Sequence, residues 1–150
     1  MNRNTLRRIH FTAALSACSL ITVFWISTVL SELFLSHQAV ANVKQVIAYA
    51  LIAQVLSMAI TGATGMKMGG KSKNKQIAAK RKRMPLIALN GLLILIPCAL
   101  FLNMKASAGA FDSVFYVVQV VELVAGAVNL TLMVQSMKEG WAIRHAKFAS

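Results

Sequence analysis

Charged side chains are scarce in this sequence, and acidic ones are the scarcest. Asp, Glu, Lys and Arg together make up 13% of the 150 residues, whereas a soluble domain carries roughly 25%. Hydrophobic residues make up 57%. The charges also cluster, which leaves long neutral stretches between them. This pattern argues against a water-soluble domain and indicates that lipid surrounds most of the chain.

Cysteine is also nearly absent, and so are the motifs that carry enzyme chemistry. Cys18 and Cys98 both lie inside apolar runs, and two thiols do not make a disulfide framework. The sequence contains no clustered metal-ligand spacing, no phosphate-binding glycine loop and no nucleophile–base pair. We therefore predict a protein that is not an enzyme and that needs neither a metal nor another cofactor.

Four long apolar runs dominate what is present. They cover residues 11–35, 43–66, 85–104 and 113–137. Each can cross about 30 Å of hydrocarbon, which takes about 20 helical residues at 1.5 Å each. Only a helix satisfies its own backbone hydrogen bonds in lipid. We expect an all-α integral membrane protein, with residues 1–150 forming one transmembrane domain. The links between the first and second runs and between the third and fourth are short, so we expect an up-down-up-down four-helix bundle.

Basic residues lie almost entirely on one side of this predicted arrangement. All Lys and Arg residues except Lys44 and Lys105 fall at the amino end, in the link 67–84 or in the tail 138–150. The positive-inside rule then places both termini in the cytoplasm of a bacterial-type inner membrane. It makes 67–84 a basic cytoplasmic loop and 138–150 a cytoplasmic interfacial tail. In an alternative interpretation, the start of the chain is a signal peptide cleaved after Ala39-Val40-Ala41, which would leave three spans.

The net charge of +12 would suggest nucleic acid as the partner of a soluble protein. Beside a membrane span, the basic run is better explained by orientation and by attraction to anionic lipids, at about 1 kcal/mol per charge. We therefore expect a lipid bilayer that includes anionic lipids as the partner, and no nucleic acid. The residues of this run are Lys80, Arg81, Lys82 and Arg83.

The fourth run carries a polar stripe at helical spacing. Gln119, Glu122 and Asn129 fall within roughly a 100° arc of one helix face. Such a face should point to the bundle interior or to a partner, because polar groups that face lipid are costly. Asn90 and Gln54, from two other runs, complete the predicted intramembrane polar site.

We expect Glu122 to be the only ionisable residue deep in the membrane, roughly 13 Å from the outer end of its run. No Lys or Arg is expected at that depth. The side chain is then either a neutral, hydrogen-bonded tie between helices or a site for a proton, ion or ligand.

Small residues mark the predicted contacts between helices. Ala53, Ser57, Thr61 and Gly65 repeat every four residues in the second run, a spacing that lets helix backbones approach closely in lipid. Gly126 interrupts the polar stripe of the fourth run in the same way. In the third run, Pro97 lacks the N–H that would bond to the carbonyl four residues earlier, which predicts a kink.

The stretch Leu6-Arg7-Arg8-Ile9-His10, followed by a long apolar run, resembles the first span of b-type membrane cytochromes. The resemblance implies a haem b held between histidines on facing helices, and only His10 and His145 could converge. No histidine lies in the middle of a run, however, which departs from the cytochrome pattern. Haem is therefore an alternative rather than the favoured prediction.

A second resemblance covers most of the chain. Residues 24–34, 83–91 and 111–130 resemble segments of uncharacterised small four-span inner-membrane proteins of proteobacteria. The resemblance implies location and topology but no activity. We favour an accessory or assembly subunit that acts through helix packing with a membrane protein partner or in a homo-oligomer. The alternatives are an oligomeric transporter of protons or small solutes that uses Glu122, and a haem-binding electron carrier.

Overall fold

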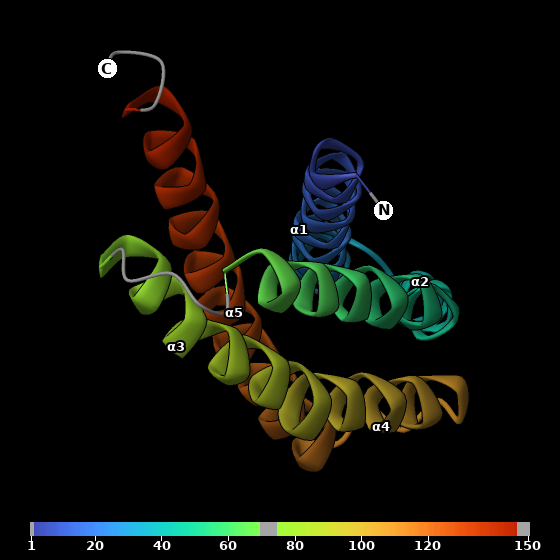
Figure 1. Ribbon diagram of the computed structural model, residues 1–150. Helices are drawn as coiled ribbons and strands as arrows, with labels where there is room; N and C mark the ends of the chain where they lie inside the picture. The colour runs from blue at the N-terminus through green and yellow to red at the C-terminus, as the bar shows by residue number, and fades with distance from the viewer. Residues whose placement is uncertain (1, 70–74, 147–150) are drawn as a thin grey trace.

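The computed structural model describes residues 2–69 and 75–146, and helices make up nearly all of them. The elements are α1 (Arg3–Phe34), α2 (His37–Gly69), α3 (Lys75–Asn90), the short π-helical segment η1 (Gly91–Leu95), α4 (Ile96–Ser107) and α5 (Ser113–Ala146). Because α3, η1 and α4 follow one another without a break, the chain forms four rods (Figure 1). All four are long and apolar enough to cross a membrane. The predicted all-α fold is confirmed, with four helices that are able to span a membrane.

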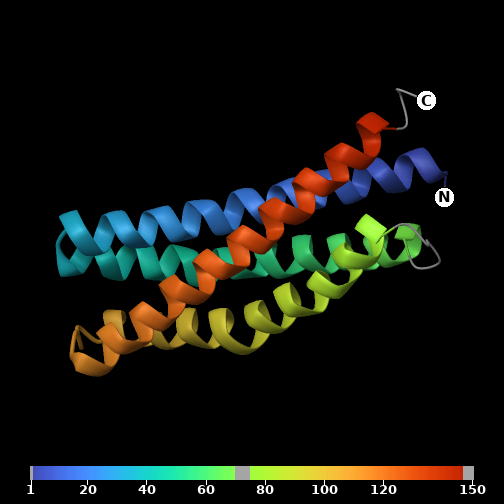
Figure 2. The ribbon, with the colours of Figure 1, turned by 90° about the vertical axis from the view of Figure 1, so that its left-hand side faces the viewer.

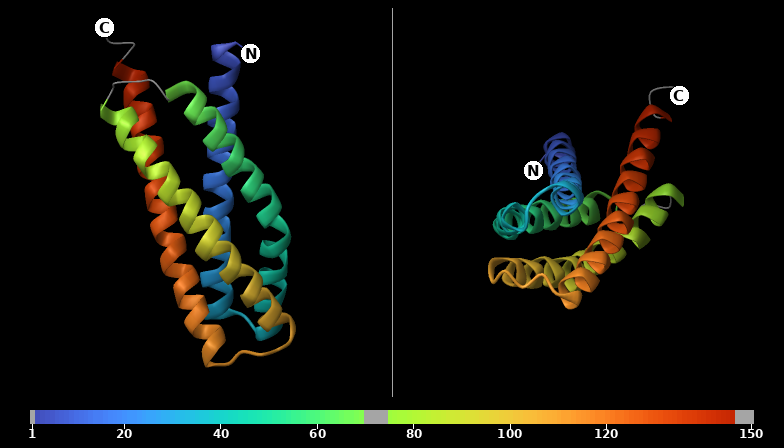
Figure 3. Two further views of the ribbon diagram at one scale, coloured as in Figure 1. Left: turned by 60° about the horizontal axis from the view of Figure 1, so that its bottom comes forward. Right: turned by 180° about the vertical axis from the view of Figure 1, so that it is seen from behind.

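The rods run lengthwise along the molecule, with α5 crossing the others at an angle. Figure 2 shows both termini at one end and the α1–α2 and α4–α5 links at the opposite end, which we call the link end. The α1–α2 pair packs along most of its length, while α4 lies against α2 and α3 lies against α5. Helix α5 also contacts α1 and α4, so it joins the two halves of the bundle (Figure 3).

Side-chain caps and turns set the helix ends. The Asn2 side chain accepts a hydrogen bond from the Asn4 N–H at 3.3 Å where α1 begins. The Asp112 side chain caps the start of α5 in the same way, because its Oδ1 accepts a hydrogen bond from the Phe115 N–H at 3.0 Å. The α4–α5 link turns at Gly109, whose φ of 68° suits glycine far better than other residues. These local features allow the sharp reversals that bring the rods side by side.

The expected break at Pro97 takes the form of a π-helical turn. The Ile96 N–H bonds to the carbonyl of Gly91, five residues back instead of four. Proline has no N–H to continue the ordinary ladder, so the rod changes its hydrogen-bond register just before Pro97. The turn places Gly91 in the bundle interior, where it is buried.

The helices extend well beyond the predicted membrane runs. Most of the predicted loop 67–84 is helical, because α2 ends at Gly69 and α3 begins at Lys75. The predicted tail 138–150 continues α5 as far as Ala146, and residues 147–150 lie outside the described part of the chain. Lys, Arg and Glu are good helix formers. A change to charged residues therefore ends the apolar segment without ending the helix.

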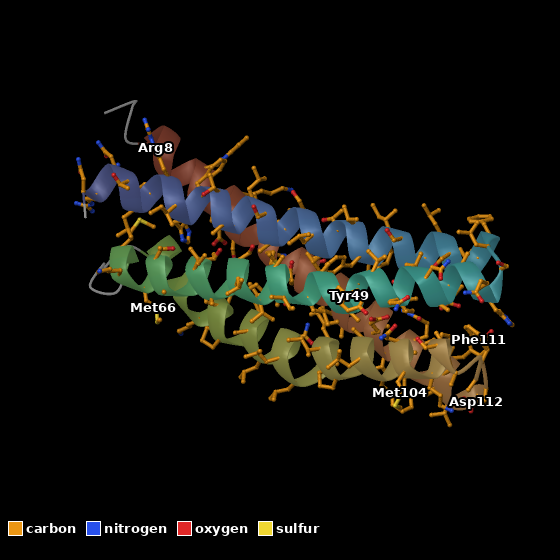
Figure 4. All side chains as sticks on the ribbon, turned by 90° about the vertical axis from the view of Figure 1, so that its right-hand side faces the viewer. Arg8, Tyr49, Met66, Met104, Phe111 and Asp112 are labelled. Atoms are coloured by element: carbon orange, nitrogen blue, oxygen red, sulfur yellow. The ribbon has the colours of Figure 1, made fainter. Side chains whose placement is uncertain are left out.

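Large apolar side chains cover much of the surface, and the interior combines apolar and polar residues. Large apolar side chains on every rod are exposed, among them Leu33, Tyr49, Leu93 and Val117 (Tyr49 is labelled in Figure 4). The buried residues include a high share of polar ones, listed here: Thr28, Ser31, Lys44, Gln54, Thr64, Gln119, Asn129 and Ser136. Apolar surface on this scale needs lipid or protein to cover it. The fold is that of a multi-pass membrane protein.

Candidate intramembrane polar site

A buried ion pair joins α2 to α5. The Lys44 ammonium lies 2.7 Å from the Glu122 carboxylate, with the Lys44 side chain fully buried and the Glu122 side chain 12% exposed. The expectation that no Lys or Arg lies at the depth of Glu122 is therefore wrong. Helix α2 begins at His37, upstream of the predicted start at residue 43. Lys44 thus lies about two turns, roughly 10 Å, inside the helix, which is close to the depth of Glu122.

Gln119 belongs to the same cluster, as its spacing predicted. Its Nε2 donates to Glu122 Oε2 at 2.9 Å, so this carboxylate oxygen accepts hydrogen bonds from both Gln119 and Lys44. The Gln119 side chain is buried, and its Oε1 has no hydrogen-bond partner among the described residues. The Gln119 amide is therefore tied to the ion pair through its nitrogen.

A second carboxyl group lies near this pair. Glu32, close to the end of α1, is within electrostatic reach of Lys44, Glu122 and His37. Its Oε1 is buried and lacks a partner in the described part of the chain. Helix α4 contributes Cys98, which is within reach of both Lys44 and Glu122. Each of the four rods therefore contributes a titratable group to the electrostatic surroundings of this pair, and the structure shows one ion pair among them, Lys44–Glu122.

Two interhelical hydrogen bonds hold α5 just beyond the ion pair. Trp25 Nε1 of α1 donates to the Leu123 carbonyl at 2.9 Å, and Asn90 Nδ2 of α3 donates to the Ala125 carbonyl at 2.8 Å. A Cβ atom at Gly126 would lie 3.0 Å from Trp25 Cδ1, so glycine is what lets the indole approach. The residues 122–126 are thus where α1, α2 and α3 all bond to α5.

Trp25 was not among the predicted site residues. A signal for it exists in the sequence, because the N–H of a Trp in an apolar run needs a hydrogen-bond partner. The identity of that partner cannot be inferred from the run itself.

The remaining predicted polar residues do not join the ion-pair cluster. Asn129 is completely buried beside Gly91, where its Nδ2 would lie 3.9 Å from a Cβ built on that glycine. Gln54 is buried in α2, ten residues or roughly 15 Å beyond Lys44. Neither amide has a hydrogen-bond partner among residues 2–69 and 75–146. The predicted site therefore divides into a charged cluster and two separate buried amides.

The predicted small-residue seam on α2 also divides into two parts. Gly65 is closely packed, because a Cβ there would lie 3.2 Å from His10 Cε1 and 3.3 Å from Met84 Cε. The Thr61 carbonyl, one turn away, is 3.1 Å from His10 Nδ1. Ala53 is exposed and Ser57 is half-buried, and both line a shallow groove between α1 and α2. One part of the seam packs inside the bundle and the other opens to its surface.

His10 lies at the interface of α1 with α2. Its Nδ1 is 2.9 Å from Thr64 Oγ1, while the side chain of His145 lies outside the described part of the chain. Within the described residues, no group of three His, Cys, Asp or Glu side chains could hold a metal ion. The haem hypothesis stays a prediction from the sequence.

Ion pairs near the two ends of the bundle join successive rods. Arg83, predicted to contact anionic lipid, bonds to Glu139 of α5 at 2.7 Å. Lys82 is exposed, and the side chains of Lys80 and Arg81 are not described. At the link end, Lys105 bonds to Asp112. This hydrogen bond and the one from the Phe115 N–H hold the pKa of Asp112 below its ordinary value.

The comparisons with known proteins add no family or activity to this geometry. The resemblance to small four-span membrane proteins, and to cytochromes in the first span, therefore stays a prediction. Searches against protein-family models, curated proteins and solved structures found no match for the chain.

Proposed function

We propose that the protein is a non-enzymatic accessory or assembly subunit of a bacterial inner membrane, and that it acts by packing its helices against a membrane protein partner. Both termini and the basic segments around residues 67–84 lie on the cytoplasmic side in this proposal. The positive-inside rule supports that orientation. Figure 4 shows Arg8 and Met66 at one end of the bundle and Phe111 and Asp112 at the other, so the two ends would face opposite sides of the membrane in this proposal.

The groove between α1 and α2 is the observation that carries the proposal. Ser16, Ser19, Ala53 and Ser57 line it together with Leu20 and Val23. Small side chains let a further helix come close enough for backbone packing in lipid, where helix association depends on van der Waals contact and hydrogen bonds. The groove is not filled by α3, α4 or α5, so it is available to a helix from outside this chain.

Filling the groove tests this proposal. Ala53→Leu adds bulk in the groove, and Ala59→Leu adds the same bulk at an exposed α2 position that does not line it. After gentle detergent extraction, we expect the native chain and Ala59→Leu to migrate as the same larger complex and Ala53→Leu to migrate as the free subunit. A native chain that is extracted only as a free subunit would contradict the proposal. So would an Ala53→Leu complex of unchanged size and yield.

Transport of protons or small solutes by an oligomer is the second candidate. The buried Lys44–Glu122 pair favours it, because intramembrane ionisable groups commonly mark ion and proton pathways. The test measures the flux of protons or small solutes into vesicles that contain the purified protein. Glu122→Gln should abolish flux and leave the helical content intact, whereas unchanged flux in this variant rejects the candidate.

A further inference from the structure

Asn129 is a polar side chain at the centre of the bundle that no protein group bonds. Its relative exposure is 0%, and neither its Oδ1 nor its Nδ2 has a hydrogen-bond partner among residues 2–69 and 75–146. A buried amide without hydrogen bonds is costly, and nearly all buried polar groups avoid that cost by bonding to protein or to ordered water. Asn129 therefore needs a partner other than the described residues.

Gly91 leaves room beside this amide. A Cβ atom at Gly91 would lie 3.7 Å from Met58 Cε and 3.9 Å from Asn129 Nδ2. Both distances are ordinary van der Waals contacts, so a group the size of a methyl fits at this glycine, between side chains of α2 and α5. A water molecule is about as large as a methyl group. A water oxygen displaced from the Cβ position by about 1 Å toward Asn129 Nδ2 would be at hydrogen-bond distance from it.

The surroundings of this space decide which ligand it takes. Asn129 offers a donor and an acceptor, and Met58 Sδ, 3.8 Å from the same Cβ position, is a weak acceptor. Met58 also packs against the apolar cluster that includes Ile87 and Met133. An ion placed among these apolar side chains and one amide would lose most of its hydration, which is costly. The ligand that fits is neutral, small and able both to donate and to accept a hydrogen bond.

We propose that Asn129, Gly91 and Met58 form a binding site for one water molecule, which joins α5 to α2 and to the π-helical turn. Asn129 Nδ2 donates to the water oxygen, and the water donates to Met58 Sδ. Gln54 lies one turn from Met58 on α2, so the two side chains are neighbours. The Gln54 amide is 6% exposed and likewise has no partner in the described chain. The site therefore borders a second buried amide of the same kind.

The π-helical turn accounts for the position of the site. The change of hydrogen-bond register between Gly91 and Ile96 places Gly91 in the bundle interior, where it faces α2 and α5. Turns of this type are frequent at functional sites. The α1–α2 groove plays no part in this geometry, so water binds here whether or not a partner helix occupies the groove.

Nuclear magnetic resonance of the full chain in lipid nanodiscs, with isotopically labelled asparagine, tests the site. The side-chain signal of Asn129 is identified by its loss in Asn129→Leu. We expect magnetisation transfer from water protons to this amide, with the sign of a direct contact instead of that of proton exchange. Gly91→Ala places a methyl group where the water is held and should abolish the transfer. Gly62→Ala, with nothing within 4 Å of the added atom, is the matched control and should leave the transfer unchanged.

Three results would overturn the proposal. They are an Asn129 amide that receives no transfer from water in the native chain, full transfer in a folded Gly91→Ala variant, and an equal loss of transfer in Gly62→Ala. If Gly91→Ala does not fold, the native chain decides alone: contact of the Asn129 amide with water supports the site, and contact with side-chain protons only overturns it. Because the groove is not altered in any of these chains, failure of this site would leave the proposed function untouched.

Discussion

Removing one member of the Lys44–Glu122 pair should destabilise the protein much more than removing both. At 2.7 Å and an effective dielectric constant of about 20, the gross attraction is about 6 kcal/mol, part of which only offsets the cost of burying the charges. Loss of one partner from a buried pair costs about 3–5 kcal/mol, because the other charge stays behind without compensation.

The two single variants should not cost the same. Glu122→Gln keeps an oxygen that can accept the Gln119 Nε2 hydrogen bond, and it leaves a fully buried ammonium group. Lys44→Met leaves a carboxylate that is 12% exposed and keeps its hydrogen bond from Gln119 Nε2. We therefore expect the loss of stability to lie near the upper end of the range of about 3–5 kcal/mol for Glu122→Gln and near its lower end for Lys44→Met.

Unfolding in mixed micelles, followed by the loss of helical circular dichroism as the denaturing detergent increases, measures these differences. The double variant Lys44→Met/Glu122→Gln lacks both charges of the pair. Its stability should therefore be closer to that of the native protein than the stability of either single variant is. Lys105→Met, which breaks a partly exposed pair at the link end, should cost much less than either single variant, because water screens exposed ion pairs. Single variants of the buried pair that cost no more than Lys105→Met would refute the reasoning. A double variant that equals the sum of the singles would also refute it.

Two further predictions concern the packing of α5 and the link before it. Gly126→Ala should destabilise the protein by about 1–3 kcal/mol in the same assay, because the added Cβ would lie 3.0 Å from an indole held by its own hydrogen bond. Gly62→Ala, with nothing within 4 Å of the added atom, should be neutral or stabilising by up to about 1 kcal/mol, and equal losses at both sites would contradict this packing. Because the pKa of Asp112 is lower in the folded protein than its ordinary value of 3.8, its contribution to stability is complete above pH 3.8 and is lost as the pH falls through the lower folded value. Acid unfolding curves should therefore show a smaller loss of stability in Asp112→Asn than in the native chain, and identical curves would rule out this contribution.

The four rods could be predicted from the sequence because their cause is local. A run of apolar residues long enough to cross the bilayer must be helical, whatever it packs against. The helix ends could not be predicted in the same way. Hydropathy falls at Lys67 and Lys138, but these residues favour helix as much as their apolar neighbours do. The helices accordingly continue to Gly69 and Ala146.

The candidate site shows the same division between local and distant causes. Gln119 and Glu122 are three residues apart on one helix, so their contact follows from helix geometry alone. Lys44 and Glu122 are 78 residues apart, and their pairing depends on where α2 begins and how it lies against α5. A basic residue at the very start of an apolar run looks like an interfacial residue until the helix start at His37 is known.

Gly126 is a third residue whose role could be predicted from the sequence only in part. Its small size indicated a close contact, and the structure shows such a contact. The sequence could not identify Trp25 as the neighbour, because the two residues come from different rods.

Site-directed labelling in intact cells tests most directly whether these rods cross a membrane with the basic end inside. In a chain whose Cys18 and Cys98 are replaced by alanine, Asn4→Cys and Ser107→Cys introduce thiols at exposed positions near opposite ends of the bundle. We predict that a membrane-impermeant maleimide labels Ser107→Cys in intact cells and reaches Asn4→Cys only after lysis. Labelling of Asn4→Cys in intact cells, with Ser107→Cys protected, would contradict the orientation. Labelling of both before lysis would contradict the membrane-spanning arrangement itself.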